Sequence, residues 1–173
     1  MESPPRRKRL RVLALTSVAA LALLLGGCGF HLRGDVTYAF HSLYLNAPPG
    51  DPLTPELHRA IAAAGTHLVD SPAAADVVLD VTGIADDKEV LSLSGGGRVR
   101  EFLLVKSLTI ALHDNHGREW LPTAQLSVRR SYTFNEAEVL AREAQEVRLL
   151  KEMQTDIVQQ IIRRLQAAQR PPG

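Results

Sequence analysis

The stretch RVREFLLVKSLTIALHDNHGREWLPTAQLSVRRSYTF, residues 98–134, decides the expected fold because it contains two long strand patterns separated by a turn. Between residues 98 and 113, both alternate sets of positions carry apolar side chains, which predicts a strand that is central in its sheet or meets a partner. Residues 113–117, HDNHG, supply the Asp, Asn and Gly that hairpin turns favour. Residues 125–134 then alternate apolar and polar side chains, and Arg130 alone interrupts the apolar set. A long hairpin is therefore the expected centre of the fold.

The residues before this hairpin predict a strand, a helix and a second strand. Residues 42–47 and the β-branched segment 75–83 read as short strands. Between them, Thr54 is predicted to cap a helix that Gly65 ends. Such a crossover makes the two strands parallel neighbours, or nearly so. Residues 84–97, rich in acidic residues, Ser and Gly, are expected to form a loop.

A long amphipathic helix is predicted after the hairpin. Asn135 and Glu138 form a plausible capping box, and helical spacing continues to Ala168. A helix of this length leaves room for a bend or break near residues 142–145. Its apolar stripe comprises Leu140, Val147, Leu150, Ile157, Ile161 and Leu165.

This order of elements predicts an α+β fold. Two amphipathic helices and about four strands suit a two-layer sandwich, with a mixed sheet and both helices packed on one of its faces. Residues 43–168 are expected to form this single domain, and residues 169–173, which contain Pro171 and Pro172, a disordered tail.

The N-terminal residues follow the pattern of a signal peptide. Five basic residues within the first eleven precede an uncharged, mostly apolar run of 16 residues, Val12–Gly27. A transmembrane anchor is the alternative, but a helix needs about 20 apolar residues to cross the hydrocarbon core. Residues 1–27 are therefore predicted to be removed.

Cys28, the single cysteine of the chain, directly follows this run. Leu25–Cys28 resembles the lipobox of bacterial lipoproteins, which implies an S-diacylglycerol group and an N-acyl chain on Cys28. A buried core cysteine is the alternative, although a core residue would not stand at a signal-peptide boundary. More than one acyl chain would anchor the protein stably, with residues 28–42 as the tether. In the sorted lipoproteins that this segment resembles, an Asp after the cysteine commonly retains the protein in the inner membrane. The resemblance therefore implies that this chain, with Gly29 at that position, lies in the outer membrane on its periplasmic side.

Charge and composition narrow the classes of partner. Without residues 1–27 the chain has a net charge of about −3, which argues against general nucleic-acid binding because that requires an excess of basic residues.

Motifs for catalysis are weak throughout. His113, His116 and Asp114 lack further metal ligands at a recognisable spacing, so a hairpin turn is the preferred interpretation. Gly95–Gly97 lacks the strand and helix of a phosphate-binding loop. The adjacent carboxylates of Asp86 and Asp87 tend to point apart, and Ser92 and Ser94 lack the surroundings of a nucleophile elbow. We expect no enzyme activity, no metal and no cofactor beyond the lipid on Cys28.

A basic and apolar surface is the best candidate for a binding site. Arg98, Arg100 and Lys106 have the same parity as Phe102 and Leu104, so a regular strand would present all five on one face. Guanidinium groups bind phosphate while apolar side chains cover hydrocarbon, which suits a phosphorylated, acylated amphiphile. Ordinary solvated charges at a sheet end are the alternative.

Three segments resemble the lipopolysaccharide-assembly lipoprotein LptE family: CGFHLRG (28–34), PLTPELHRAIAAAGTHLVD (52–70) and VLAREAQEVRLLKEMQTDIVQQIIRRL (139–165). The resemblance implies a non-enzymatic outer-membrane lipoprotein that plugs the β-barrel LptD, supports barrel assembly and binds lipopolysaccharide. It also implies that Arg98 and Arg142 contact lipopolysaccharide. Two other functions stay open: a lipoprotein that carries a lipid or acts as a scaffold without a barrel partner, and a lipid-anchored hydrolase, for which the sequence displays no nucleophile and base.

Overall fold

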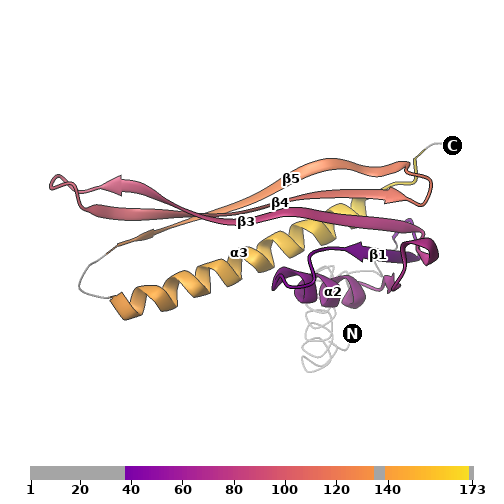
Figure 1. Ribbon diagram of the computed structural model, residues 1–173, viewed down its shortest axis with the longest axis horizontal. Coiled ribbons are helices and arrows are strands. Elements are labelled where there is room, and N and C mark those ends of the chain that lie inside the picture. The colour runs from indigo at the N-terminus through magenta and orange to yellow at the C-terminus, as the bar shows by residue number, and fades with distance from the viewer. Residues whose placement is uncertain (1–37, 135–138, 172–173) are drawn as a thin grey trace, which may run out of the picture. The chain divides into compact units, whose positions relative to one another are not determined.

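The computed structural model describes residues 38–134 and 139–171, apart from the side chains of residues 139–142. The predicted signal peptide, Cys28, Gly29, most of the tether, and the capping residues Asn135 and Glu138 lie outside this description. In chain order the elements are β1 (Ser42–Asn46), α2 (Leu53–Ala63), β2 (His67–Leu68), a 3₁₀ turn (Pro72–Ala74), β3 (Val77–Leu93), β4 (Val99–Asp114), β5 (Glu119–Thr133) and α3 (Val139–Ala167) (Figure 1).

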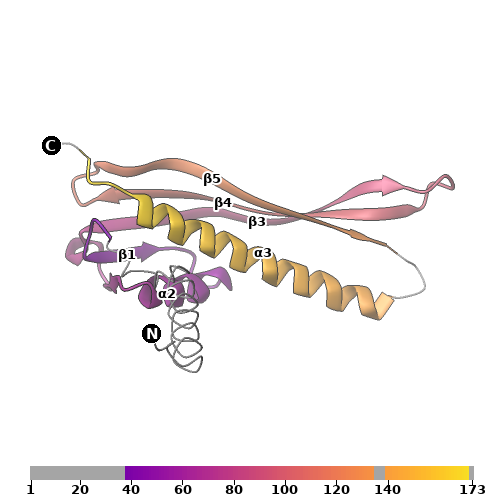
Figure 2. The ribbon, with the colours of Figure 1, turned by 180° about the vertical axis from the view of Figure 1, so that it is seen from behind.

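The strands form one mixed sheet in the order β2-β1-β3-β4-β5. β1 pairs in parallel with both β2 and β3, which confirms the predicted parallel neighbours, and β3, β4 and β5 are antiparallel. Both helices lie on the same side of the sheet, and α3 runs along its length (Figure 2). The α+β two-layer prediction is confirmed. The sheet has five strands rather than about four because β2 has two residues, too few for a recognisable sequence period.

β3 is twice as long as predicted, and the loop expected over residues 84–93 is wrong. A register shift between Thr82 and Ala85, where Gly83 has a φ of 60°, lets the strand continue past the first glycine. The extension has exposed polar residues that give no burial period, but β4 supplies a pairing partner along its whole length. The second half of β3 is therefore a strand because it pairs with β4, although its own sequence has no strand pattern.

The start of α2 also differs from the prediction. The carboxylate of Asp51 accepts a hydrogen bond from the N–H of Leu53 at 2.8 Å, whereas the Thr54 hydroxyl donates to the carbonyl of Pro48 at 2.6 Å. Thr54 therefore lies inside the first turn. Asp51, two residues before the first helical residue, accepts from a free N–H of the first turn, which is the role that we predicted for Thr54.

The core lies between the sheet and the two helices. Alternate residues of β4, from Leu104 to Leu112, face the helices, as predicted. The largest of the fully buried side chains are Leu43, Leu53, Leu57, Ile61, Leu79, Leu104, Leu108, Ile110, Leu112, Met153, Ile157 and Ile161. Tyr38 and Phe40 also pack in this core, so packing begins before the predicted domain start at residue 43.

α3 is one continuous helix over the described residues, so the break considered near residues 142–145 does not occur. The predicted stripe is correct at Ile157, Ile161 and Leu165, which are buried. The prediction that Val147 belongs to the buried stripe is wrong, because its side chain is 67% exposed. Met153 takes part in the core instead, since only the C-terminal half of α3 has α2 beside it.

Candidate functional site

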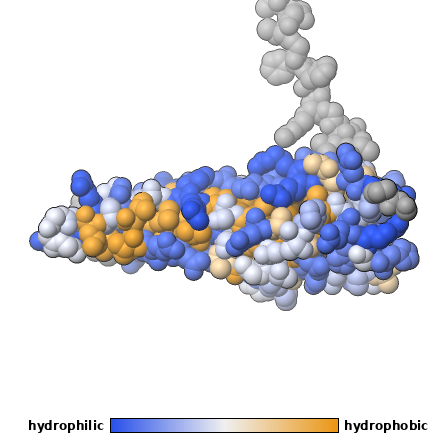
Figure 3. Space-filling view, turned by 90° about the horizontal axis from the view of Figure 1, so that it is seen from above, coloured by the Kyte–Doolittle hydropathy of each residue, from blue (hydrophilic) through white to orange (hydrophobic). Residues whose placement is uncertain are grey.

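The end of the sheet that carries the β3–β4 turn has an apolar surface. Val90, Leu91 and Leu93, which we call the distal apolar tip, are 50–57% exposed, and each stands in the last four residues of β3. Figure 3 shows apolar side chains gathered at this end of the molecule, with hydrophilic residues at their margin. Such surfaces mark sites of interaction when they are contiguous.

The β3–β4 turn places basic residues beside the distal apolar tip. The N–H of Ser94 donates to the carbonyl of Arg98 at 2.7 Å, and Gly97, with a φ of 76°, donates to the carbonyl of Ser94 at 2.9 Å. A side chain at Gly97 would strain this turn. The predicted loop at Gly95–Gly97 is thus a tight hairpin turn, and the exposed Arg98 and Arg100 follow it directly.

Lys106 differs from the other predicted binding residues. Its side chain is 3% exposed, and its ammonium group lies 2.6 Å from the carboxylate of Asp86. It shares the inward face with Leu104, as its parity predicts, but that face is covered, so its charge is already neutralised inside the sheet–helix layer. The expectation of one accessible face for Arg98, Arg100 and Lys106 is therefore wrong at Lys106. The side chain of Arg142 is outside the described residues.

Lys88, Tyr132 and Glu146 form a polar cluster beneath the tip. The Lys88 ammonium lies 2.5 Å from Glu146 Oε2, and the Tyr132 hydroxyl donates to the same oxygen at 2.6 Å. The ammonium also lies 4.5 Å from the centre of the Phe102 ring, within cation–π range. The cluster ties the first half of α3 to β3 and β5. Sequence reasoning missed it because its three charged or polar members are 14 to 58 residues apart.

The cluster shifts the pKa of each member. Burial alone would raise the pKa of Glu146 and lower that of Lys88, but their contacts with each other and with Tyr132 together outweigh burial. The pKa of Glu146 is therefore lowered and that of Lys88 raised, so both are charged near neutral pH. The pKa of Tyr132 is raised, first by burial and then by its bond to Glu146.

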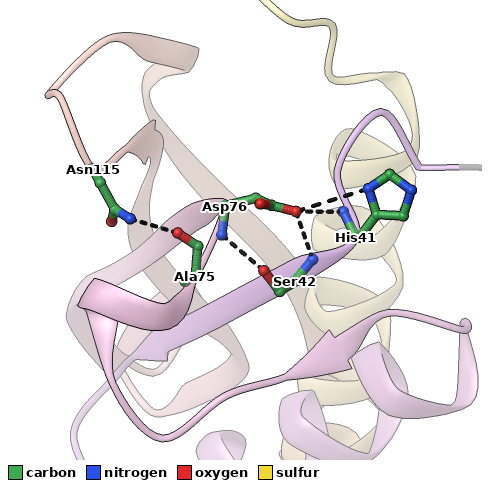
Figure 4. Close-up of polar contacts among 5 residues, drawn as sticks. All are labelled: His41, Ser42, Ala75, Asp76 and Asn115. Carbon is green, nitrogen blue, oxygen red and sulfur yellow. Dashed lines mark hydrogen bonds and ion pairs between the residues drawn. The ribbon is translucent and has the colours of Figure 1, made fainter.

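A second polar network closes the opposite end of the sheet. The carboxylate of Asp76 accepts from the N–H groups of His41 and Ser42 at 2.8 and 3.0 Å, and Ser42 Oγ accepts from the N–H of Asp76 (Figure 4). Asn115, in the β4–β5 turn, donates to the carbonyl of Ala75 at 2.6 Å. These bonds join β1, β3 and the turn, and the backbone donors lower the pKa of Asp76.

The β4–β5 turn is the predicted hairpin. Burial would raise the pKa of Asp114, but N–H donors from Arg118 and His116 and the Arg118 guanidinium lower it to about 2. Both ring nitrogens of His113 have acceptors, the carbonyl of Asp114 at 2.9 Å and a carboxylate oxygen of Asp80 at 3.0 Å. The bond to the Asp114 carbonyl is the larger cause of the raised pKa of His113. The side chains of the turn are therefore engaged in hydrogen bonds within the turn and to β3.

The remaining residues considered for chemistry are held in structural bonds. Ser92 Oγ donates to Glu101 at 2.9 Å, and Ser94 Oγ accepts from the N–H of Arg98. Asp86 pairs across the sheet with Lys106 and Asp87 with Val105, so the two carboxylates lie on opposite faces, as predicted. Among the residues that the structure describes, no helix is both long and apolar enough to span a membrane.

Comparisons of the sequence with a family model and with known proteins identify the same family. A family model named LptE, described as "Lipopolysaccharide-assembly", matches residues 40–165. An "LPS-assembly lipoprotein LptE" from Pectobacterium atrosepticum is 28% identical over 155 residues, which cover 87% of this chain and 83% of that protein. The protein of the same name from Yersinia enterocolitica is 28% identical over 91% of this chain and 76% of its own length.

Solved structures share the fold. The solution structure of an "uncharacterized lipoprotein B" from Nitrosomonas europaea has a TM-score of 0.71 and 35% identity, and covers 80% of this chain and 91% of that one. A "Minor Lipoprotein" from Acinetobacter baumannii has a TM-score of 0.63 and 25% identity, and covers 78% of this chain and 100% of its own.

Proposed function

The chain belongs to the LptE family of lipopolysaccharide-assembly proteins, and from this premise we propose that it is an outer-membrane lipoprotein that plugs the β-barrel LptD, helps it to assemble, and binds lipopolysaccharide on its way to the cell surface. It has no enzymatic role in this proposal. The family match over residues 40–165 and the lipoprotein names of its relatives support the role in lipopolysaccharide assembly.

One observation of the structure carries the binding part of this proposal. Two exposed arginines, Arg98 and Arg100, stand beside the exposed Val90, Leu91 and Leu93 at one end of the sheet. Lipopolysaccharide combines phosphate groups with acyl chains, so a surface that offers guanidinium groups and apolar side chains together is complementary to it. Among the described residues, Arg100 has no side-chain hydrogen-bond or ion-pair partner.

The Lys88–Tyr132–Glu146 cluster supports a role for Arg142 at the same end. Arg142 precedes Glu146 by four residues, about one turn of α3. Because Glu146 is bound to Lys88 and Tyr132, this turn of the helix is fixed against the sheet. The cluster therefore positions the turn of α3 that carries Arg142, the basic residue that the family resemblance assigns to binding. Lys106, in contrast, is buried and paired with Asp86.

The lipid anchor of the proposal rests on Cys28. Acylation of its thiol and of the new amino terminus would hold the domain at the membrane, since each buried methylene contributes about 0.8 kcal/mol. In this arrangement residues 38–171 reach the barrel lumen from the periplasmic leaflet.

A pull-down from native outer membranes tests the proposal. A C-terminally tagged chain is extracted in detergent, and the intact mass of each captured component is measured. We expect a chain that begins at triacylated Cys28 together with an equal amount of a large β-barrel protein. An acylated chain without a barrel would favour the free lipid carrier, and a chain that retains residues 1–27 would refute the lipid anchor.

A further inference from the structure

The two edges of the sheet are protected differently. Beyond Asp80, no strand among the described residues pairs with the outer edge of β3, and this edge carries four successive charged residues, Asp86–Glu89, and register shifts near both ends. Charges and bulges are how proteins prevent an edge from pairing with another strand. β5, the last strand of the sheet, pairs with β4 from Ala124 to Thr133 without a shift. It therefore presents a regular edge of ten residues.

The backbone register shows which N–H and C=O groups of β5 point away from β4. The N–H of Phe134 donates to the carbonyl of Arg100 at 2.7 Å, so even-numbered residues of this segment bond to β4. In an antiparallel pair the alternate residues point their N–H and C=O groups away. These are Gln125, Ser127, Arg129, Ser131 and Thr133. The carbonyl of Arg129 confirms the direction, because it accepts a hydrogen bond from the side chain of Arg130, which reaches around the edge.

A basic groove runs beside this edge. It has a volume of about 480 Å³ and lies between β5 and α3. Its lining includes three arginines, Arg129, Arg130 and Arg163, and one carboxylate, Asp156, which pairs with Arg130. The guanidinium groups of Arg129 and Arg163 make no hydrogen bond or ion pair with other described residues. None of the large apolar side chains that are exposed in the described part of the chain lines the groove.

We propose that the open edge of β5 binds an extended, acidic polypeptide segment by strand addition. The added strand bonds to the outward N–H and C=O groups of the odd-numbered residues. The carbonyl of Arg129, which already accepts from Arg130, takes part through its second lone pair. The carboxylates of the added strand meet Arg129 and Arg163. Arg129 lies opposite Val105 and thus on the outer face of the sheet, whereas Arg163 comes from the helix layer. Neighbouring side chains of a strand point to opposite faces, so two successive acidic residues reach the two arginines.

The geometry favours a polypeptide over a phosphate group. The outward backbone groups repeat about every 6.6 Å, twice the rise of a strand residue, so one phosphate would satisfy a single position and leave the others unpaired. A strand satisfies them all. The arginines add selectivity, because a basic strand would meet like charges. This proposal concerns a surface other than the distal apolar tip and does not depend on lipopolysaccharide binding.

Amide hydrogen exchange tests strand addition directly. The probe is a ten-residue peptide in which Glu-Glu pairs alternate with Thr-Val pairs, and a peptide with Lys in place of Glu is its control. NMR on the full mature chain follows exchange at Ser127, Arg129 and Ser131, with Val128 and Arg130 as internal references because their amides already bond to β4. We expect the acidic peptide to slow exchange at the odd-numbered residues at least tenfold and the basic peptide to leave it unchanged.

Variants separate the backbone contribution from the charge contribution. Ser127→Pro removes an outward N–H without breaking a bond to β4 and should abolish the protection. Arg129→Glu with Arg163→Glu should weaken peptide binding about tenfold or more, whereas Arg164→Glu, an exposed neighbour outside the groove, should not. The absence of protection by the acidic peptide in a folded chain would overturn the proposal. Equal protection by the basic peptide, or full displacement of the acidic peptide by millimolar inorganic phosphate, would also overturn it.

Discussion

The two ends of the sheet differ in the side chains through which they contact the helices. At the end where β1 and α2 lie, the side chains between sheet and helices are aliphatic and fully buried, such as Leu43, Leu57 and Ile161. At the end with the β3–β4 turn, α3 contacts the sheet through the Lys88–Tyr132–Glu146 cluster, while apolar side chains such as Leu93 and Val147 are exposed. The first end therefore contributes most of the buried apolar core, and the second is the end to which our proposal assigns lipopolysaccharide binding.

The largest expected effect is on the core of the first end. Ile161→Ala removes a side chain with no exposed surface and should lower the free energy of unfolding by about 3 kcal/mol. Urea denaturation measures it. The matched control on the same helix is Val147→Ala, which should change the free energy of unfolding by less than about 0.5 kcal/mol because Val147 is 67% exposed. Equal losses in the two variants would show that the two ends do not differ in this way.

The next effect concerns lipopolysaccharide binding at the second end. Arg98→Glu with Arg142→Glu should weaken binding about thirtyfold, since two charge-assisted contacts to phosphate would be lost. Thermal denaturation of each variant checks that it remains folded. The control is Arg59→Glu with Arg164→Glu, two exposed arginines on the helices. If binding by purified chains is equal in both double variants, Arg98 and Arg142 are not part of the site.

A smaller effect is expected in the cluster that fixes α3 at the second end. Glu146→Gln leaves Lys88 without a carboxylate partner and should lower the free energy of unfolding by about 0.5 kcal/mol, a small value because Lys88 is 40% exposed. The pKa of Glu146 is lowered on folding, so its stabilisation is present above the ordinary carboxyl pKa of 4.5 and lost as the pH falls through the folded value. Denaturation of both chains at pH 7 and pH 3 measures this, and a difference that persists at the lower pH contradicts it.

The smallest effect lies in the turn at the first end. The pKa of His113 is raised above 6.5 by its bonds to the Asp114 carbonyl and to Asp80. Its charged form therefore contributes stability that is complete below pH 6.5 and is lost as the pH rises through the folded pKa. We expect a few tenths of a kcal/mol, because the side chain is 34% exposed. An NMR titration gives the pKa, and an unshifted value would remove the contribution. His113→Gln should lose the pH dependence between pH 6 and 8.

Residue patterns predicted the elements whose contacts repeat regularly. β4 alternates between Leu104 and Leu112, and α3 carries Ile157, Ile161 and Leu165 at helical spacing, so both were recognised. The two-residue β2 and the polar second half of β3 were not, because each becomes a strand only through pairing with a neighbour that supplies its hydrogen bonds.

The candidate site shows the same division. The basic residues at the β3–β4 turn could be selected from the sequence, and the parity of Lys106 was right, but its burial against Asp86 could not be foreseen. Asp86 was expected in a loop, and only the extension of β3 brings it across from Lys106. The Lys88–Glu146 contact likewise joins residues 58 positions apart.

By itself, the sequence determined the α+β class, the long hairpin, the two amphipathic helices and the family, because each depends on local periodicity or on residue identity along the chain. The tertiary structure decided which charges are exposed, which are neutralised and which strand edge stays open. These properties depend on the side chain or strand that lies opposite, and residues distant along the chain become opposite only when the sheet pairs and the helices pack upon it.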